Sequence, residues 1–209
     1  KEKGTPAGMA LGNATGDGLW CNWLIWSHGG KLVDKDNKVV IDSPETLKAL
    51  EYAKEMYANF APGTLSWLDP NNNKAFLDGQ VSVTNNGISI YYASKTSQDP
   101  KVTALKDDIH HANYPIGPVG VPTESHLFFN QMIMKYTKYP NAAKEFLRFM
   151  MEQEQFDPWL TGAGGYIAQP LVAYEMTAIW TVDPKHPPYR DALKTLRPEL
   201  SEREELVER

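Results

Sequence analysis

The stretch DSPETLKALEYAKEMYANF, residues 42–60, predicts a helix from its start and along its length. Ser43 is a good N-cap residue, and Pro44 suits the first helical position, where a backbone N–H has no helical partner. Glu45 then lies at the positive end of the helix dipole, which favours an acidic residue. A single apolar stripe follows at intervals of three and four residues, formed by Leu47, Leu50, Ala53, Tyr57 and Phe60.

Short strand-like segments and further helical segments lie on both sides of this helix. Helices are also predicted over 18–28, over 69–79 with Asp69 as its N-cap, over 141–160 with a break near Asp157, and over 201–209. Strands are predicted over 8–13, 80–84 and 127–135, the last buried on both faces, and a hairpin over 31–41. Because helices and strands alternate along the chain, the expected fold class is a layered α/β fold.

The composition is that of an ordinary globular protein with one large or two small domains. Of the 209 residues, 42% are hydrophobic and 22% are charged, and the net charge is −5. Proteins that coat phosphates carry a basic face, and no Lys/Arg cluster is present in the sequence, so no nucleic-acid partner is expected. The first residues, KEKGTPAG, precede no apolar signal-peptide core, so either the protein is cytoplasmic or an upstream segment is absent from this sequence.

The residues that bind metals or act as nucleophiles do not occur in the patterns those roles need. His110 and His111 are adjacent, so on a strand they point to opposite faces and do not share one metal. Cys21 lies between tryptophans in an apolar segment, where an inert buried thiol is expected. The sequence contains no G-x-S-x-G motif, and GAGG at 162–165 is not followed by the Lys-Ser/Thr pair of a phosphate loop. No metal and no cofactor are therefore expected.

Paired carboxylates are the enzymatic alternative, because a glycosidase holds two acids about 5 to 10 Å apart across its sugar site. Asp17, Asp69, Asp78 and Glu124 lie near predicted loops, but nothing in the sequence pairs them. Asp17 and Asp69 are expected to cap helices instead. A glycoside-active enzyme that uses Asp17 or Asp69 stays open as an alternative.

The aromatic residues are the most informative feature, and GDGLWCNWLIWSHGG at 16–30 holds three of the six tryptophans. The predicted helix in this stretch is apolar nearly all round, which is typical of a buried helix, so Trp23 and Trp26 are expected in the core. Trp20 lies in the first turn beside Asp17, where a ring can stack on the C–H face of a polyol while polar groups bind its hydroxyls. Tyr91, Tyr92, Trp67 and Tyr166 also lie at loop–helix junctions.

The order of these elements resembles that of the extracellular solute-binding proteins of bacterial ABC importers, in the sugar-binding group that includes maltose-binding protein. The resemblance runs from about Met9 to Tyr189, and its most specific pieces are DSPETLKAL, FLDGQVSVTNNG, a PIGPVG turn and NAAKEFLRFM. It implies a periplasmic-binding-protein-like (type II) lobe of α/β class, with no catalysis and no cofactor. It also implies a carbohydrate as the solute, permease subunits as membrane partners, and a periplasmic or extracellular location after a signal peptide or lipid anchor.

The resemblance further implies that the sequence begins where the second of two lobes begins. Residues 5–122 would then belong to the second lobe, 123–168 would return to the first lobe, and 169–209 would form C-terminal helices of the second lobe and a tail. A fragment of this kind would hold half a cleft, and we expect it to bind its solute weakly or not at all.

Carried over position by position, the family's ligand contacts fall at three places. They match Asp17, Trp20 and Asn22 in the Trp-rich helix, Asn86, Ser89 and Tyr91 after the F-x-x-G segment, and Tyr166 in the Gly-rich loop. Sugar binders of the family often carry an aromatic residue where Ser89 stands, and Tyr91 is the expected substitute. A polyamine or an anionic solute stays open, as does an intracellular interaction module with a Trp-rich patch.

Overall fold

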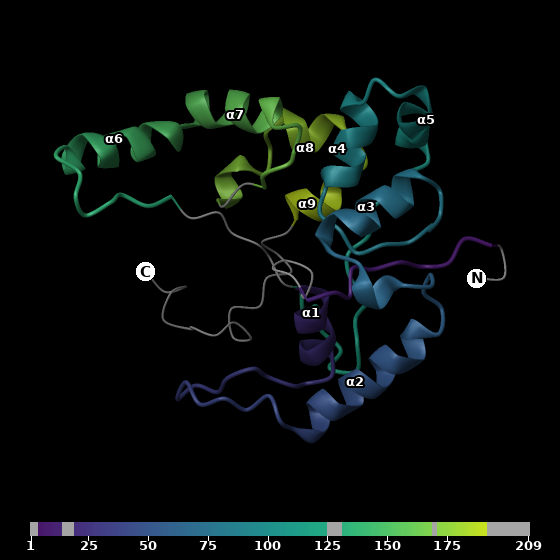
Figure 1. The fold of residues 1–209 in the computed structure, drawn as a ribbon. Coiled ribbons are helices and arrows are strands. Elements are labelled where there is room, and N and C mark those ends of the chain that lie inside the picture. Colours follow the sequence, from purple (N-terminus) through teal and green to yellow (C-terminus); the bar gives the residue numbers. More distant parts are fainter. Residues whose placement is uncertain (1–3, 14–18, 125–130, 169–170, 192–209) are drawn as a thin grey trace. The chain divides into compact units, whose positions relative to one another are not determined.

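The computed structural model describes residues 4–13, 19–124, 131–168 and 171–191 (Figure 1). The chain divides into two compact units. The described residues of unit 1 lie between 4 and 124, and those of unit 2 lie between 131 and 191. None of the helices in these ranges is long and apolar enough to cross a membrane.

The described part of unit 1 contains five α-helices and two 3₁₀ helices. In chain order they are α1 (Leu19–Ser27), α2 (Pro44–Tyr57), η1 (Thr64–Ser66), α3 (Asp69–Leu77), α4 (Ser89–Thr96), α5 (Pro100–Thr103) and η2 (Ala104–Asp107). The predicted helices over 18–28, 42–60 and 69–79 are confirmed within a few residues at each end. The predicted cap of α2 is confirmed as well, because Ser43 Oγ accepts a hydrogen bond of 3.2 Å from Thr46 N.

The predicted cap of α3 is wrong by one residue. Leu68 is the N-cap, and Asp69 is the first helical residue. The side chain that closes this end is Asn71, whose Oδ1 accepts a 2.7 Å hydrogen bond from Leu68 N. Asp69 still lies at the positive end of the dipole, so its charge suits the position without a capping bond.

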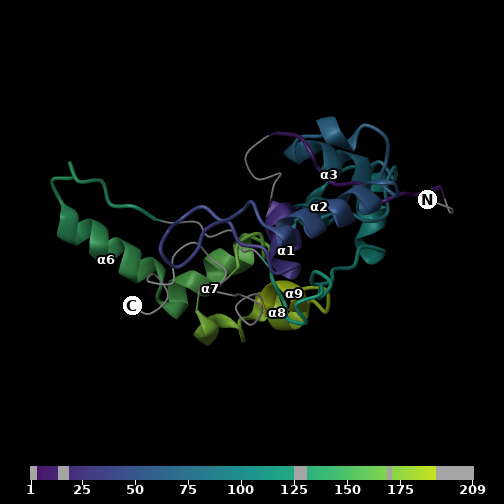
Figure 2. The same cartoon turned by 90° about the horizontal axis from the view of Figure 1, so that it is seen from below.

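Helix α2 packs on α1 through a face that includes Ala53 but not the leucines of the predicted stripe (Figures 1 and 2). Leu47 and Leu50 are 58% and 57% exposed, whereas Thr46 and Ala49 are buried. The approach is close, because a Cβ added at Gly30 would lie 2.7 Å from Ile25 Cγ2 and 2.8 Å from Thr46 Oγ1. Since α1 presents large side chains here, only small residues of α2 fit against it.

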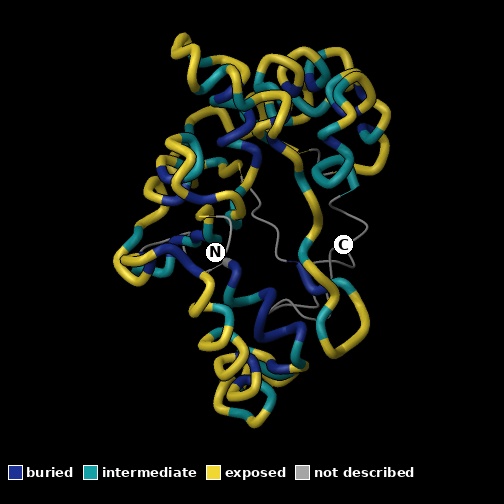
Figure 3. Tube along the Cα trace, turned by 90° about the vertical axis from the view of Figure 1, so that its right-hand side faces the viewer, coloured by how far each residue is buried: buried dark blue, intermediate teal, exposed yellow. Residues whose placement is uncertain are grey.

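The core of unit 1 is built mainly by α1, whose buried run is dark blue in Figure 3. Its buried members are Trp20, Trp23, Leu24, Ile25, Trp26 and Ala49. Trp23 and Trp26 are 6% and 8% exposed, which confirms that both belong to the core. A second small cluster joins Ala61, Ala75 and Val81.

The predicted strands of unit 1 are reduced to isolated bridges in the described residues. Ala7 forms parallel bridges with both Phe60 and Val83, and Val33 pairs with Val39 in the predicted hairpin. The predicted strand over 8–13 is wrong beyond Gly8, whose amide donates to Val83 O at 2.9 Å, because two later amides bond to a 3₁₀ turn and the residue after it. Leu11 N donates to Thr64 O and Gly12 N donates to Trp67 O, at 3.2 and 2.8 Å.

The described part of unit 2 contains α6 (Pro140–Met150), α7 (Gln153–Gly162), η3 (Val172–Tyr174), α8 (Ala178–Val182) and α9 (Pro187–Arg190). Its core joins Phe156, Leu160, Tyr174 and Trp180. The helix predicted over 141–160 does break, but at Met151 and Glu152, and Pro158 lies inside α7. The position of the predicted break near Asp157 is therefore wrong.

The predicted strand over 127–135 is also wrong for its described residues, 131–135, which adopt no regular structure. Met132 and Met134 are 77% and 50% exposed, so this segment is not buried on both faces. A strand needs a neighbouring strand for its backbone hydrogen bonds, and no described residue pairs with these. Residues 127–130 and the helix predicted over 201–209 lie outside the described residues.

Candidate functional site

Of the three residues predicted in and before α1, two are described. Trp20 is 9% exposed and packs in the same cluster as Trp23 and Trp26, while Asn22 is half-buried. Asp17 lies outside the described residues. The contact of these residues with a ligand stays a prediction, and only a small part of the Trp20 ring is open to one.

The turn before α4 brings together two of the predicted residues. Asn86 Nδ2 donates a hydrogen bond of 2.8 Å to Ser89 Oγ. A third residue, Asn73 of α3, donates from its own Nδ2 to the same oxygen at 3.2 Å. Asn73 and Ser89 are half-buried, as is Asn86, so this polar cluster lies at the edge of unit 1.

Asn73 was not among the predicted site residues, although the sequence carries a signal there. Asparagine is a poor residue for a helix interior, and three in a row at 71–73 occur inside α3. The structure gives each one a separate partner. Asn71 closes the start of α3, Asn72 donates to Asn85 O at 3.0 Å, and Asn73 bonds to Ser89.

Tyr91 is engaged within unit 1. It is 6% exposed, and its ring packs edge-on against His111 at a centroid distance of 5.2 Å. Lys95 Nζ lies 5.2 Å from the centre of the same ring, which is a cation–π distance. A stacking role for Tyr91 stays a prediction, and a ligand would have to compete with these two neighbours.

A second polar network holds the turn before Asn86 from the other side. The hydroxyl of Tyr114 donates to Asn85 Oδ1, and the Tyr114 ring stacks on Trp23 at 4.7 Å. Glu124 is buried, and its carboxylate accepts from Tyr114 N at 3.0 Å and from Asn113 Nδ2 at 3.2 Å. Burial raises the pKa of Tyr114 above its ordinary range, and the charges of Glu124 and Cys21 raise it further.

Tyr166, the remaining predicted residue, belongs to unit 2 and is 52% exposed. It follows two glycines with positive φ, Gly164 and Gly165, just after α7. The other described site residues all belong to unit 1. Whether Tyr166 shares a ligand with them stays a prediction.

The acids of the enzymatic alternative are not gathered in the described residues. Asp78 pairs with Lys74 at 2.6 Å on the surface, Asp69 begins α3, and Glu124 bonds to amide groups. Among the described residues, no group of three or more His, Cys, Asp and Glu side chains is arranged to hold a metal ion. The Cys21 thiol has a raised pKa because it is partly buried, which disfavours the reactive thiolate.

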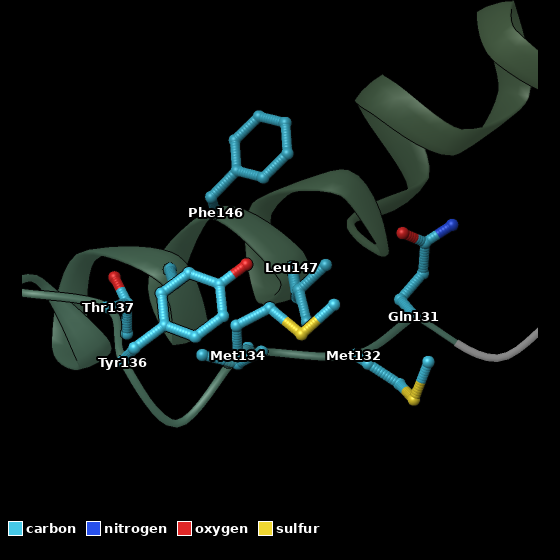
Figure 4. A pocket seen from close by; sticks show the side chains of 9 residues that line it. Gln131, Met132, Met134, Tyr136, Thr137, Phe146 and Leu147 are labelled. Atoms are coloured by element: carbon cyan, nitrogen blue, oxygen red, sulfur yellow. The ribbon is translucent and has the colours of Figure 1, made fainter.

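Unit 2 carries a shallow apolar groove that contains none of the predicted ligand residues (Figure 4). It lies between α6 and the segment before it, and its lining residues are Gln131, Met132, Ile133, Met134, Tyr136, Thr137, Ala143, Phe146 and Leu147. Although α6 is strongly amphipathic, none of its residues is buried. The apolar side of α6 is therefore open in the described part of the chain.

Comparison with known proteins gives one family. The family model described as "Bacterial extracellular solute-binding protein" matches residues 3–188. A "Probable ABC transporter-binding protein" of Deinococcus radiodurans is 24% identical over 144 residues, which are 66% of this chain and 33% of that protein. The chain therefore spans about a third of the length of this curated relative.

Three solved structures share the fold. They are the maltose-bound MalE3 of T. maritima (19% identity, TM-score 0.61), a solute-binding protein of Agrobacterium vitis with bound D-mannitol (17%, 0.63), and one of Agrobacterium radiobacter in complex with ribitol (19%, 0.62). The matches cover 93%, 95% and 93% of this chain, but only 49%, 48% and 48% of those chains. They confirm the predicted α/β periplasmic-binding-protein-like lobe, spanning about half of each neighbour.

Proposed function

Because this chain belongs to the bacterial extracellular solute-binding family, we propose that it is part of the solute-binding component of an ABC importer and that its solute is a carbohydrate or a polyol. The family is one of binding proteins outside the cytoplasm, which argues against the glycoside-active enzyme and the intracellular module. A signal peptide or lipid anchor, as the resemblance implies, is part of the proposal, and so are permease subunits as partners.

The observation that carries the choice of solute is the polar cluster of Asn73, Asn86 and Ser89. Its side chains are uncharged and supply both donors and acceptors, which suits hydroxyl groups. A polyamine needs several carboxylates, and none of the three residues provides one. Maltose, D-mannitol and ribitol in the three structural neighbours agree with a hydroxyl-rich solute.

In this proposal the solute binds between two lobes that close on it, as in hinged binding proteins. Asn86 and Ser89 bind hydroxyls from one side of the cleft, together with Asp17 and Asn22. Aromatic rings stack on the C–H faces of the solute, and Trp20, Tyr91 and Tyr166 are the proposed rings.

The lobe assignment of residues 123–168 is part of the same proposal. Phe146, Phe149 and Met132 are 60%, 44% and 77% exposed, so this segment presents a large apolar surface in the described chain. Exposed patches of this kind mark surfaces that pack against other polypeptide. The neighbours are about twice as long as the matched region, and a first lobe of that length would cover this surface.

Titration of the ¹⁵N-labelled chain followed by NMR tests the solute class, because chemical shifts report even millimolar binding. We expect ribitol, mannitol and maltose, added to tens of millimolar, to shift the side-chain amides of Asn73 and Asn86. Spermidine at the same concentration is the control and is expected to leave them unchanged. The carbohydrate proposal fails if spermidine shifts these amides and no polyol or sugar does.

A further inference from the structure

We infer that Asn73, a residue outside the predicted site, is a positioning residue that fixes the direction in which Ser89 donates its hydroxyl proton to the solute. This inference rests on the proposed function. Asn73 lies on α3, Ser89 is the first residue of α4, and Asn86 lies in the turn before it. The two helices lie side by side (Figure 1), and their packing brings the three side chains together.

The direction follows from the hydrogen-bonding capacity of Ser89. A hydroxyl oxygen has two acceptor sites and one proton to donate. Asn73 Nδ2 and Asn86 Nδ2 both donate to Ser89 Oγ, at 3.2 and 2.8 Å, and together they use both acceptor sites. The Ser89 O–H therefore points away from both amides, and Ser89 meets a solute as a donor.

The other end of the Asn73 amide is its carbonyl oxygen. Asn73 Oδ1 is buried and has no hydrogen-bond partner among the described residues. An unpaired buried acceptor costs free energy, and a reversed amide would leave the N–H group unpaired in the same place, so this cost does not distinguish the two orientations. The hydrogen bond from Asn73 Nδ2 to Ser89 Oγ sets the direction of the hydroxyl, since a reversed amide would accept the Ser89 proton and hold it against Asn73.

The direction of the Ser89 hydroxyl determines which solutes can form a hydrogen bond with it. A donor at Ser89 requires an acceptor on the solute, and the oxygen of a neutral hydroxyl or of a sugar ring provides one. The ammonium group of a polyamine carries donors only, so it meets Ser89 without a hydrogen bond. Asn73 thus favours polyols over amines without necessarily touching the solute.

A double-mutant cycle with the 209-residue chain and ribitol tests whether Asn73 acts through Ser89. We expect Asn73→Ala to weaken binding about 3- to 10-fold, the usual effect of one lost hydrogen bond. The double variant Asn73→Ala/Ser89→Ala is expected to bind no more weakly than Ser89→Ala alone, because the two residues form one unit. Lys74→Ala, a change on the same helix at a side chain that is 74% exposed, is the control and leaves affinity unchanged.

Asn73→Asp reverses the direction of the hydrogen bond with Ser89, because a carboxylate accepts the Ser89 proton and has no N–H to donate. It is expected to weaken ribitol binding at least as much as Asn73→Ala does. Full affinity in Asn73→Asp, or additive losses in the cycle, would overturn the positioning role while leaving the polyol site in place.

A measurement without solute separates this inference from the proposed function. Ser89→Ala is expected to shift the side-chain amide resonances of both Asn73 and Asn86 in the free protein. If neither resonance moves, the hydrogen bonds to Ser89 are absent and the inference is wrong whatever the chain binds. If both move but wild-type chain binds no polyol or sugar, the proposed function falls and the role in recognition falls with it.

Discussion

The hydroxyl of Tyr114 stabilises unit 1 in a way that depends on pH, and Tyr114→Phe isolates this contribution. The substitution removes the hydrogen bond to Asn85 Oδ1 but keeps the ring that stacks on Trp23. A lost hydrogen bond of this kind costs about 1 kcal/mol in the free energy of unfolding at neutral pH. The variant is therefore expected to be less stable than wild type by about that amount.

The difference shrinks at alkaline pH because burial, and then Glu124, raise the pKa of Tyr114 above its ordinary value of 10.0. Above that value the unfolded chain loses the phenol proton while the folded chain keeps it. The contribution is therefore complete below pH 10 and falls as pH rises toward the folded pKa, by about 1.4 kcal/mol per pH unit. The phenylalanine variant has no such proton, so the advantage of wild type disappears within roughly one pH unit above 10.

Urea unfolding from neutral pH to about pH 11, followed by tryptophan fluorescence, measures both effects. Lysines and the other groups titrate equally in the two proteins, so their contributions cancel in the difference. Tyr136→Phe is the matched control, since Tyr136 is 83% exposed, and its difference from wild type is expected to stay constant. A Tyr114→Phe difference that is constant or grows above pH 10 would refute the reasoning.

Two further substitutions test the packing of unit 1. Gly117→Ala is expected to lower the free energy of unfolding by about 1–3 kcal/mol, because the new Cβ would lie 2.6 Å from Ser27 Cβ. In the control, Gly162→Ala, the new Cβ meets nothing within 4 Å, and a comparable loss there would contradict the steric explanation. Ser43→Ala removes the cap of α2 and is expected to cost about 1 kcal/mol, with Ser43→Thr retaining most of the stability in thermal unfolding.

The helices were predictable because their ends depend on neighbours in sequence. Ser43 and Thr46 form the cap of α2 within four residues, and the structure has that bond. The buried face of α2 was not predictable from the same residues. It depends on α1, whose large side chains admit Thr46 and Ala49 but leave Leu47 and Leu50 exposed.

The strands depended on partners that lie far away along the chain. An alternating segment such as 80–84 is expected to pair, but the sequence does not say with what. In the structure Ala7 forms bridges with Phe60 and Val83, and Gly8 N donates to Val83 O. The amides of Leu11 and Gly12 instead donate to the carbonyl oxygens of Thr64 and Trp67. The bridges therefore stop after one residue pair, where a local reading of the sequence predicts a strand.

The candidate site also contains residues that could be grouped from the sequence and one that could not. Asn86 and Ser89 lie three residues apart, so the resemblance and the local turn were enough to group them. Asn73 reaches the same oxygen only because α3 packs beside α4. The run of asparagines signalled an unusual helix, but its partners required the three-dimensional arrangement.

The Trp-rich helix supports the polar cluster through Trp23. Its ring stacks on Tyr114, its Nε1 donates to Pro115 O at 3.1 Å, and its carbonyl oxygen accepts from Thr123 Oγ1 at 3.3 Å. Tyr114 in turn bonds to the side chain of Asn85, the residue before Asn86.

Asn85 is thus held from two sides, because Asn72 donates to its backbone oxygen while Tyr114 holds its side chain. Fixing Asn85 fixes the start of the turn that places Asn86 against Ser89. A polar group that must meet a hydroxyl within a few tenths of an ångström needs such rigid support. The large tryptophans of α1 therefore fill the core and, through Trp23, also anchor a polar turn. Stacking on a solute is not needed to account for Trp23.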